Sequence, residues 1–102
     1  MKYALHFGPD AMHVDLEGAF TFWDTRAFRV LLGAIGNNHG RAEIRLNVSR
    51  LISIDASALA LLMTAHDMAK KQHCPLVFEQ PQGQVQAVLS RAARFNALNF
   101  AA

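Results

Sequence analysis

The stretch IRLNVSRLISIDASALALLM, residues 44–63, decides the fold. Apolar and polar side chains alternate over Ala42–Val48, which predicts a half-buried strand. A turn is expected over 49–54, and a strongly apolar helix follows Asp55. Free backbone N–H groups and the positive end of the helix dipole point outward where such a helix begins. The Asp55–Ser57 segment is therefore suited to recognition or phosphorylation.

Upstream of this stretch, residues 2–7 and 12–17 each alternate between apolar and polar side chains. Gly8-Pro9-Asp10 lies between them and signals a turn, so the two segments predict an antiparallel hairpin. Gly18 is expected to end the second strand.

A helix should follow, capped by Thr21 or Asp24. Its predicted inward stripe is Ala27, Val30, Leu31, Ala34 and Ile35, and the Gly/Asn-rich segment 36–40 should end it. Phe22 and Trp23 are interpreted as a lid over the sheet edge, with an exposed aromatic patch near this helix as the alternative.

Downstream, the pattern predicts a helix over 56–72, a strand over 76–78 and a helix spanning 85–92. The inward face predicted for the helix 56–72 is Leu59, Leu62, Met63, His66 and Ala69. Phe95, Leu98 and Phe100 are spaced to fold a tail onto the core. The order β-β-α-β-α-β-α predicts an α/β fold with a mixed, mostly parallel sheet of four to five strands. The strand 42–48 is expected at its centre.

The composition favours one globular domain over residues 1–102. Hydrophobic residues make up 52% of the chain and charged residues 18%, which argues against disorder. The net charge is only +2, without a dense Lys/Arg run, so the composition gives no support for nucleic-acid binding.

The single cysteine, Cys74, excludes an intrachain disulfide and is typical of a reducing cytosol. We expect it to be a buried structural thiol. The N-terminal residues lack the apolar run of a secretory signal, and no apolar stretch reaches 18 residues. A cytoplasmic protein without membrane insertion is expected.

The run IDASALALL, residues 54–62, resembles the Asp-Ser-Ser-Gly/Ala-Leu signature of STAS domains, the fold of bacterial anti-sigma factor antagonists. Leu16-Glu17-Gly18 resembles the Leu-x-Gly strand end of that family, and residues 81–100 are similar to its last helix and tail. The segments WDTRAFR (23–29) and RFNALNF (94–100) look most like the small single-domain antagonists of Gram-negative bacteria. The resemblance covers nearly the whole chain and implies the STAS fold.

One departure from the family pattern concerns the phosphate. In the family, the regulatory phosphate goes on the first Ser after the Asp, and that position here is Ala56. Ser57 matches the second Ser, and Ala58 matches the Gly/Ala. The domain is naturally unphosphorylatable at this position, or the signal has moved to Ser57, or Ala56 is an engineered Ser→Ala change.

The resemblance implies a non-enzymatic module that acts as an anti-sigma factor antagonist in a phosphorylation-controlled partner switch. The elbow Asp55–Ala58 would bind an anti-sigma factor or a serine kinase/phosphatase regulatory protein. The alternative is a constitutive STAS subunit of a larger assembly, such as a transporter accessory domain, for which Ala56 would be natural.

Other chemistries have weak sequence support, and no cofactor is expected. Asp55 is foremost a helix N-cap. His66 and His73 are seven residues apart, whereas helical metal sites use spacings of three or four, so no metal site is predicted. A hydrolase built from Ser57, Asp55 and His66 lacks the G-x-S-x-G motif, and the Gly-rich segment 33–40 lacks a P-loop context.

Overall fold

The structure of this chain is a computed structural model that describes residues 1–37 and 42–101. It contains five strands, three α-helices and a short 3-10 helix within those ranges. The elements in chain order are β1 (Lys2–Phe7), β2 (Ala11–Phe20), η1 (Phe22–Asp24), α1 (Thr25–Gly36), β3 (Glu43–Ile54), α2 (Ala56–Lys71), β4 (Leu76–Glu79), α3 (Gly83–Ala92) and β5 (Asn99–Ala101).

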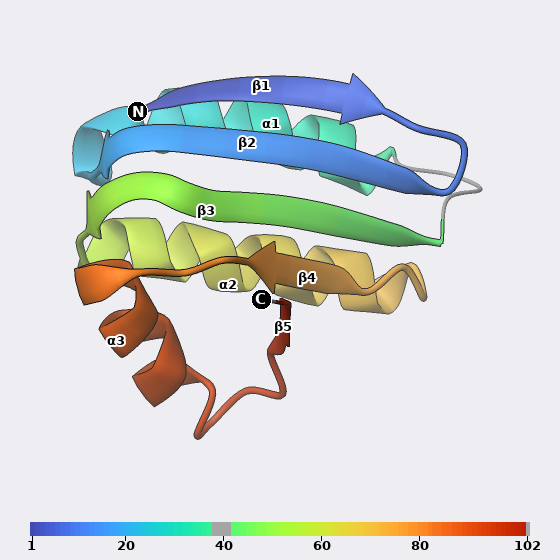
Figure 1. The fold of residues 1–102 in the computed structure, drawn as a ribbon. Coiled ribbons are helices and arrows are strands. Elements are labelled where there is room, and N and C mark those ends of the chain that lie inside the picture. The colour runs from blue at the N-terminus through green and yellow to red at the C-terminus, as the bar shows by residue number, and fades with distance from the viewer. Residues whose placement is uncertain (38–41, 102) are drawn as a thin grey trace.

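The strands form one sheet in the order β1-β2-β3-β4-β5 (Figure 1). The β1–β2 pair is antiparallel, and the other three pairs are parallel. This confirms the predicted mixed, mostly parallel α/β fold with the third strand at its centre. The fifth strand is formed by the tail, where Phe100 stacks on Phe78 with ring centroids 6.0 Å apart.

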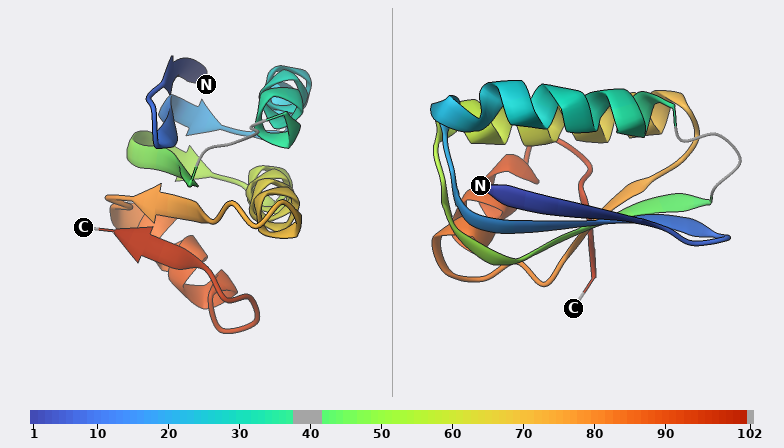
Figure 2. Two further views of the ribbon diagram at one scale, coloured as in Figure 1. Left: turned by 90° about the vertical axis from the view of Figure 1, so that its right-hand side faces the viewer. Right: turned by 90° about the horizontal axis from the view of Figure 1, so that it is seen from above.

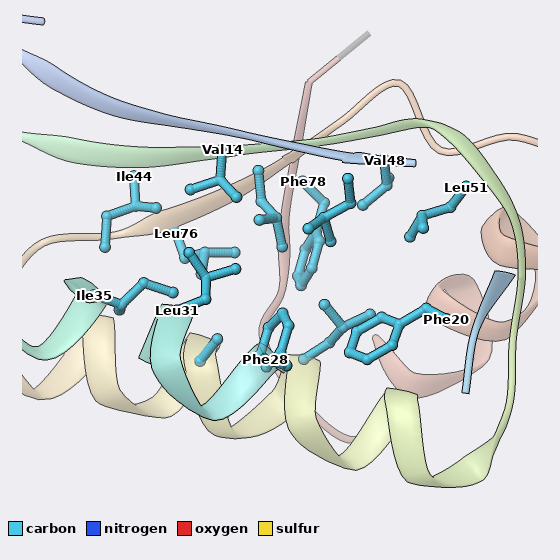
Figure 3. Packing of buried hydrophobic residues seen from close by; sticks show 14 of the residues in the cluster. Val14, Phe20, Phe28, Leu31, Ile35, Ile44, Val48, Leu51, Leu76 and Phe78 are labelled. Atoms are coloured by element: carbon cyan, nitrogen blue, oxygen red, sulfur yellow. The ribbon is translucent and has the colours of Figure 1, made fainter. Parts of the chain in front are cut away.

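The helices α1 and α2 lie side by side over one face of the sheet, whereas α3 lies apart from them on the β4 side (Figure 2). Alternate residues of the central strands point toward α1 and α2, among them Val14, Ile44 and Val48 (Figure 3). The spacing of Phe28, Leu31 and Ile35 gives α1 its buried stripe. Burial of each such side chain contributes about 1.5–3 kcal/mol.

Small residues on α2 bring that helix close to the sheet. Its buried residues are Ala58, Leu62, Ala65, His66 and Ala69. The three alanines leave little bulk between the helix and the strands beneath it. Phe20 and Phe28 fill the neighbouring space with ring centroids 4.9 Å apart.

Two strands are longer than the sequence predicts. Gly18 does not end β2, since the strand continues to Phe20. Gly18 adopts φ +91° where the β2–β3 register is irregular, so the strand bulges there instead of ending. Glycine reaches this backbone region without steric cost. Residues 49–54 likewise are not a turn, since β3 continues to Ile54 and buries Leu51 and Ile54. The bulged register explains why period-2 alternation is lost there.

Several side chains differ from their predicted positions. Val30 is 65% exposed rather than inward, because the stripe of α1 is narrower than predicted. Phe95 is 88% exposed and does not fold onto the core, whereas Leu98 does pack against the core. Helix α1 ends at Gly36 as predicted, and residues 38–40 of the predicted stop lie outside the described residues. Cys74 is buried as expected.

Within the described ranges, no helix is both long and apolar enough to traverse a bilayer.

Candidate functional site: the strand-to-helix elbow

The elbow Asp55–Ala58 connects the centre of the sheet to α2. Asp55 is the N-cap of this helix, and its Oδ1 accepts a hydrogen bond from the N–H of Ala58 at 2.8 Å. The backbone of Asp55 is extended, with φ −98° and ψ −177°, as an N-cap residue requires. The predicted capping role of Asp55 is confirmed.

The same carboxylate also reaches the loop after β2. Its Oδ2 accepts a hydrogen bond from the N–H of Phe22 at 2.9 Å, across 33 residues of sequence. The backbone N–H of Asp55 donates to the Phe20 carbonyl at 3.3 Å. Asp55 therefore fixes the position of η1 relative to the elbow. Nothing in the local sequence pattern signals this long-range contact.

The short helix η1 is held by its own capping box. The N–H of Trp23 donates to Thr21 Oγ1 at 3.3 Å, and Asp24 Oδ2 accepts from the N–H of Thr21 at 2.9 Å. Asp24 Oδ1 also lies 3.0 Å from the N-terminal ammonium of Met1. The Thr21 hydrogen bond, with a smaller contribution from this ammonium, holds the pKa of Asp24 below its ordinary value. Thr21 and Asp24 therefore cap η1, whereas Asp24, the N-cap residue of α1, makes no side-chain cap hydrogen bond to that helix.

The four elbow positions differ in accessibility. Asp55 and Ala56 are exposed, and Ser57 is half-buried. Ala58 is fully buried and packs in the core, so its side chain is not available to a partner. The surface of the elbow is therefore made by the first three of these residues.

Phe22 and Trp23 lie beside the elbow and are exposed. They do not form the predicted lid, because Trp23 is 87% and Phe22 58% exposed. Their rings make an edge-to-face contact with centroids 5.6 Å apart. Together with Thr25, Arg26 and Arg29 they line a surface pocket of about 410 Å³. We call Phe22, Trp23, Arg26 and Arg29 the aromatic-basic patch.

The exposed Phe22 and Trp23 match the alternative to the lid that the sequence offered, whereas the two arginines were not identified from the sequence. The segment WDTRAFR does carry a signal for the patch, because two arginines occupy polar positions of the helix directly after a Phe-Trp pair.

Helix α3 is hydrogen-bonded to the same end of the sheet through the side chain of Gln84. Gln84 Nε2 donates to the Ile54 carbonyl, and the Ile54 N–H donates to Gln84 Oε1, both at 2.9 Å. The amide thus pairs with the last residue of β3 as a neighbouring strand would. This contact holds the residue before Asp55, and the sequence pattern does not signal it.

The geometry does not assemble a hydrolytic triad at the elbow. His66 lies nine residues after Ser57 on the same helix, a rise of about 13 Å. His66 is also buried, with only 4% of its surface exposed. Among the described residues, no group of three or more His, Cys, Asp or Glu side chains is placed to hold a metal ion.

Comparison of the sequence with the curated proteins finds no match. Among solved structures, the fold is similar to the unphosphorylated anti-sigma factor antagonist SpoIIAA, with a TM-score of 0.77, 13% identity, and coverage of 99% of this chain and 88% of that one. The phosphorylated form of SpoIIAA from Bacillus gives a TM-score of 0.75 at 14% identity, covering 99% of this chain and 92% of the other.

A sulfate transporter family protein from Wolinella succinogenes is also similar, with a TM-score of 0.72, 18% identity, and coverage of 88% of this chain and 75% of that one. At these identities the likeness establishes the fold alone. The sequence itself matches the family model described as "Mlab, STAS domain" over residues 3–96. This match confirms the resemblance carried by the elbow sequence, and the chain belongs to the STAS domain family.

Proposed function

We propose that this chain, acting as a single domain over residues 1–102, is a non-enzymatic protein-binding module of the anti-sigma factor antagonist type. Its docking surface is the elbow together with the aromatic-basic patch. The observation that carries this proposal is the pair of hydrogen bonds accepted by Asp55, which joins the first turn of α2 and η1 into one preorganised surface. A surface that is already ordered loses little entropy when it binds.

The patch has the composition of a binding hot spot. Trp and Arg are enriched among the residues that dominate interface energetics. Trp23 exposes 87% of its surface beside Arg26 and Arg29. We expect the partner to present an apolar cleft for the indole and carboxylates for the two guanidinium groups.

The phosphorylation state of the elbow would control this binding. A phosphate adds about −1.5 to −2 charges and three acceptor oxygens. At the exposed position 56 it would lie beside the Asp55 carboxylate and inside the contact surface, so the complex would separate. Ala56 has no hydroxyl, and the domain would therefore stay in its binding-competent form unless Ser57 replaces it as acceptor.

The proposed switch is tested by restoring the hydroxyl. Ala56→Ser, incubated with the partner kinase and ATP, should gain one phosphate at residue 56 by mass spectrometry and lose affinity for the kinase. Ser90→Thr is a matched control, because it changes an exposed hydroxyl on α3. If Ala56→Ser remains unmodified in the presence of an active kinase, the phosphorylation switch is wrong for this chain.

A second candidate is a constitutive STAS subunit of a larger assembly, such as a transporter. The exposed Ala56 favours it, because such a subunit uses the docking surface without a phosphate cycle. A photo-crosslinking amino acid at position 23, introduced in the native host, distinguishes the two candidates. A crosslink to an anti-sigma factor or serine kinase supports the first candidate, and a crosslink to a transporter ATPase supports the second.

A further inference from the structure

A second pocket lies far from the elbow, at the other end of α2. It has a volume of about 400 Å³ and is formed between the C-terminal half of α2, the start of β4 and the tail that leads into β5. The volume is within the range of small-molecule sites, which is about 300–1,000 Å³.

The pocket is lined by a buried histidine. His66 lines it and is only 4% exposed, and within the described residues its Nδ1 makes no hydrogen bond. Buried polar atoms are hydrogen-bonded in the great majority of cases, because leaving one unpaired costs free energy. Among the described residues, His66 is the only polar or charged residue that is buried.

The charge around His66 favours an anionic ligand. Lys70 and His73 line the pocket, and none of its described lining residues is acidic. Two carbonyls near the end of α2, those of Ala69 and Lys70, already accept hydrogen bonds. The N–H groups of Gln72 and Cys74 donate to the Ala69 carbonyl at 3.1 and 3.0 Å, and that of His73 donates to the Lys70 carbonyl at 3.0 Å.

The rest of the lining suits an apolar body. Pro75, Leu76 and Ala97 provide apolar surface, and the side-chain amide of Asn99 is held in place by donating to the Leu76 carbonyl at 3.3 Å. A ligand with one anionic group and a small apolar part would place its oxygens toward His66 and Lys70. Its apolar part would then lie against the tail.

We propose that this pocket binds a small organic anion, either a monocarboxylate or a phosphate monoester. In the complex, the imidazole of His66 donates to a ligand oxygen, and Lys70 pairs with its charge. The site is independent of the proposed docking function, because Asp55 and His66 are separated by about 16 Å of helix rise. Failure of either proposal would leave the other intact.

The test uses benzoate and phenyl phosphate as probes and benzamide as the neutral control. Titrations followed by ¹H–¹⁵N NMR should show saturable shifts at Ala97 and Asn99 with one or both anions. Lys70→Gln should weaken binding about tenfold, because it removes a charge-assisted contact. Lys71→Gln is the matched control, since Lys71 is its exposed neighbour but does not line the pocket. It should leave the affinity within about twofold.

A second variant keeps the test decisive if one substitution disturbs the fold. His66→Phe preserves an aromatic ring but removes both nitrogens, so it should weaken anion binding while the amide spectrum stays folded. The probe that binds more tightly assigns the anionic group as carboxylate or phosphate. The proposal is overturned if neither anion saturates, if benzamide binds as well as benzoate, or if Lys70→Gln and Lys71→Gln bind alike.

Discussion

The Asp55 carboxylate holds Phe22 in place by accepting its backbone N–H at 2.9 Å, while its other oxygen caps α2 through Ala58. One side chain thus joins two turns that are far apart in sequence. Because these turns carry the exposed residues of the proposed docking surface, the geometry of that surface depends on Asp55.

Substitutions at Asp55 separate its two roles. Asparagine is as good an N-cap as aspartate, but its carboxamide has a single acceptor oxygen. Asp55→Asn should therefore keep the cap and lose the Phe22 contact, at a cost of about 1 kcal/mol in the free energy of unfolding. Asp55→Ala loses both and should cost about 2 kcal/mol. Urea denaturation measures these differences.

Asp67→Asn is the control for this series, because Asp67 is an exposed acid on the same helix. It should change the free energy of unfolding by less than about 0.5 kcal/mol. Equal stabilities for Asp55→Asn and wild type would mean that the Phe22 hydrogen bond contributes nothing.

Trp23 is expected to contribute to binding and hardly to stability. Because 87% of it is exposed, Trp23→Ala should change the free energy of unfolding by less than about 0.5 kcal/mol. A hot-spot tryptophan contributes at least about 2 kcal/mol to binding, so partner affinity should fall about 30-fold. Calorimetry with the purified partner, once crosslinking has identified it, measures the affinity.

Phe95→Ala is the matched control for Trp23→Ala. Phe95 is 88% exposed but belongs to the segment after α3 rather than to the patch. It should leave the affinity unchanged. A similar loss in both variants would show that general surface apolarity, and not the patch, drives association.

Gln84 is expected to stabilise the end of β3. Gln84→Ala removes both 2.9 Å hydrogen bonds to Ile54 and should lower the free energy of unfolding by about 1–2 kcal/mol. Gln86→Ala, which truncates an exposed glutamine on the same helix, should have little effect. Thermal and urea unfolding of the two variants provide the comparison, and equal stability would contradict the assigned role.

Asp24 should make stability depend on pH on the acid side. Its folded-state pKa is lowered, mainly by the Thr21 N–H, so the folded state binds fewer protons than the unfolded state, whose Asp pKa is about 3.9. The resulting stability is present above about pH 3.9 and is lost as the pH falls through the folded-state pKa. Asp24→Asn should therefore be less stable than wild type at pH 7, and the difference should shrink on acidification. A difference independent of pH would contradict this.

Much of the fold follows from sequence periodicity. The alternation in Ala42–Val48 and the stripe containing Leu31 and Ile35 predicted the central strand and the helix beside it, and the Asp55 cap predicted where α2 begins. The bulges that extend β2 and β3 were missed because a bulge breaks the period on which strand prediction relies.

The candidate site was only partly predictable. The elbow is a local motif, so Asp55, Ala56 and Ser57 were identified from consecutive residues. The contacts that position it are not local, since Phe22 and Gln84 each lie about 30 residues from their partners. The exposure of Trp23 was only the second choice from the sequence, because an aromatic pair is more often buried than exposed.

The central claim is that the elbow is the partner-binding surface. The most direct test uses the partner that crosslinking identifies and compares its affinity for wild type, Ser57→Asp and Ser90→Asp. Circular dichroism checks that each variant is folded. Ser57→Asp places a charge in the elbow next to Asp55, and we predict that it weakens binding at least about tenfold, whereas Ser90→Asp on α3 does not. Unchanged binding by folded Ser57→Asp would remove the elbow from the interface and contradict the proposed function.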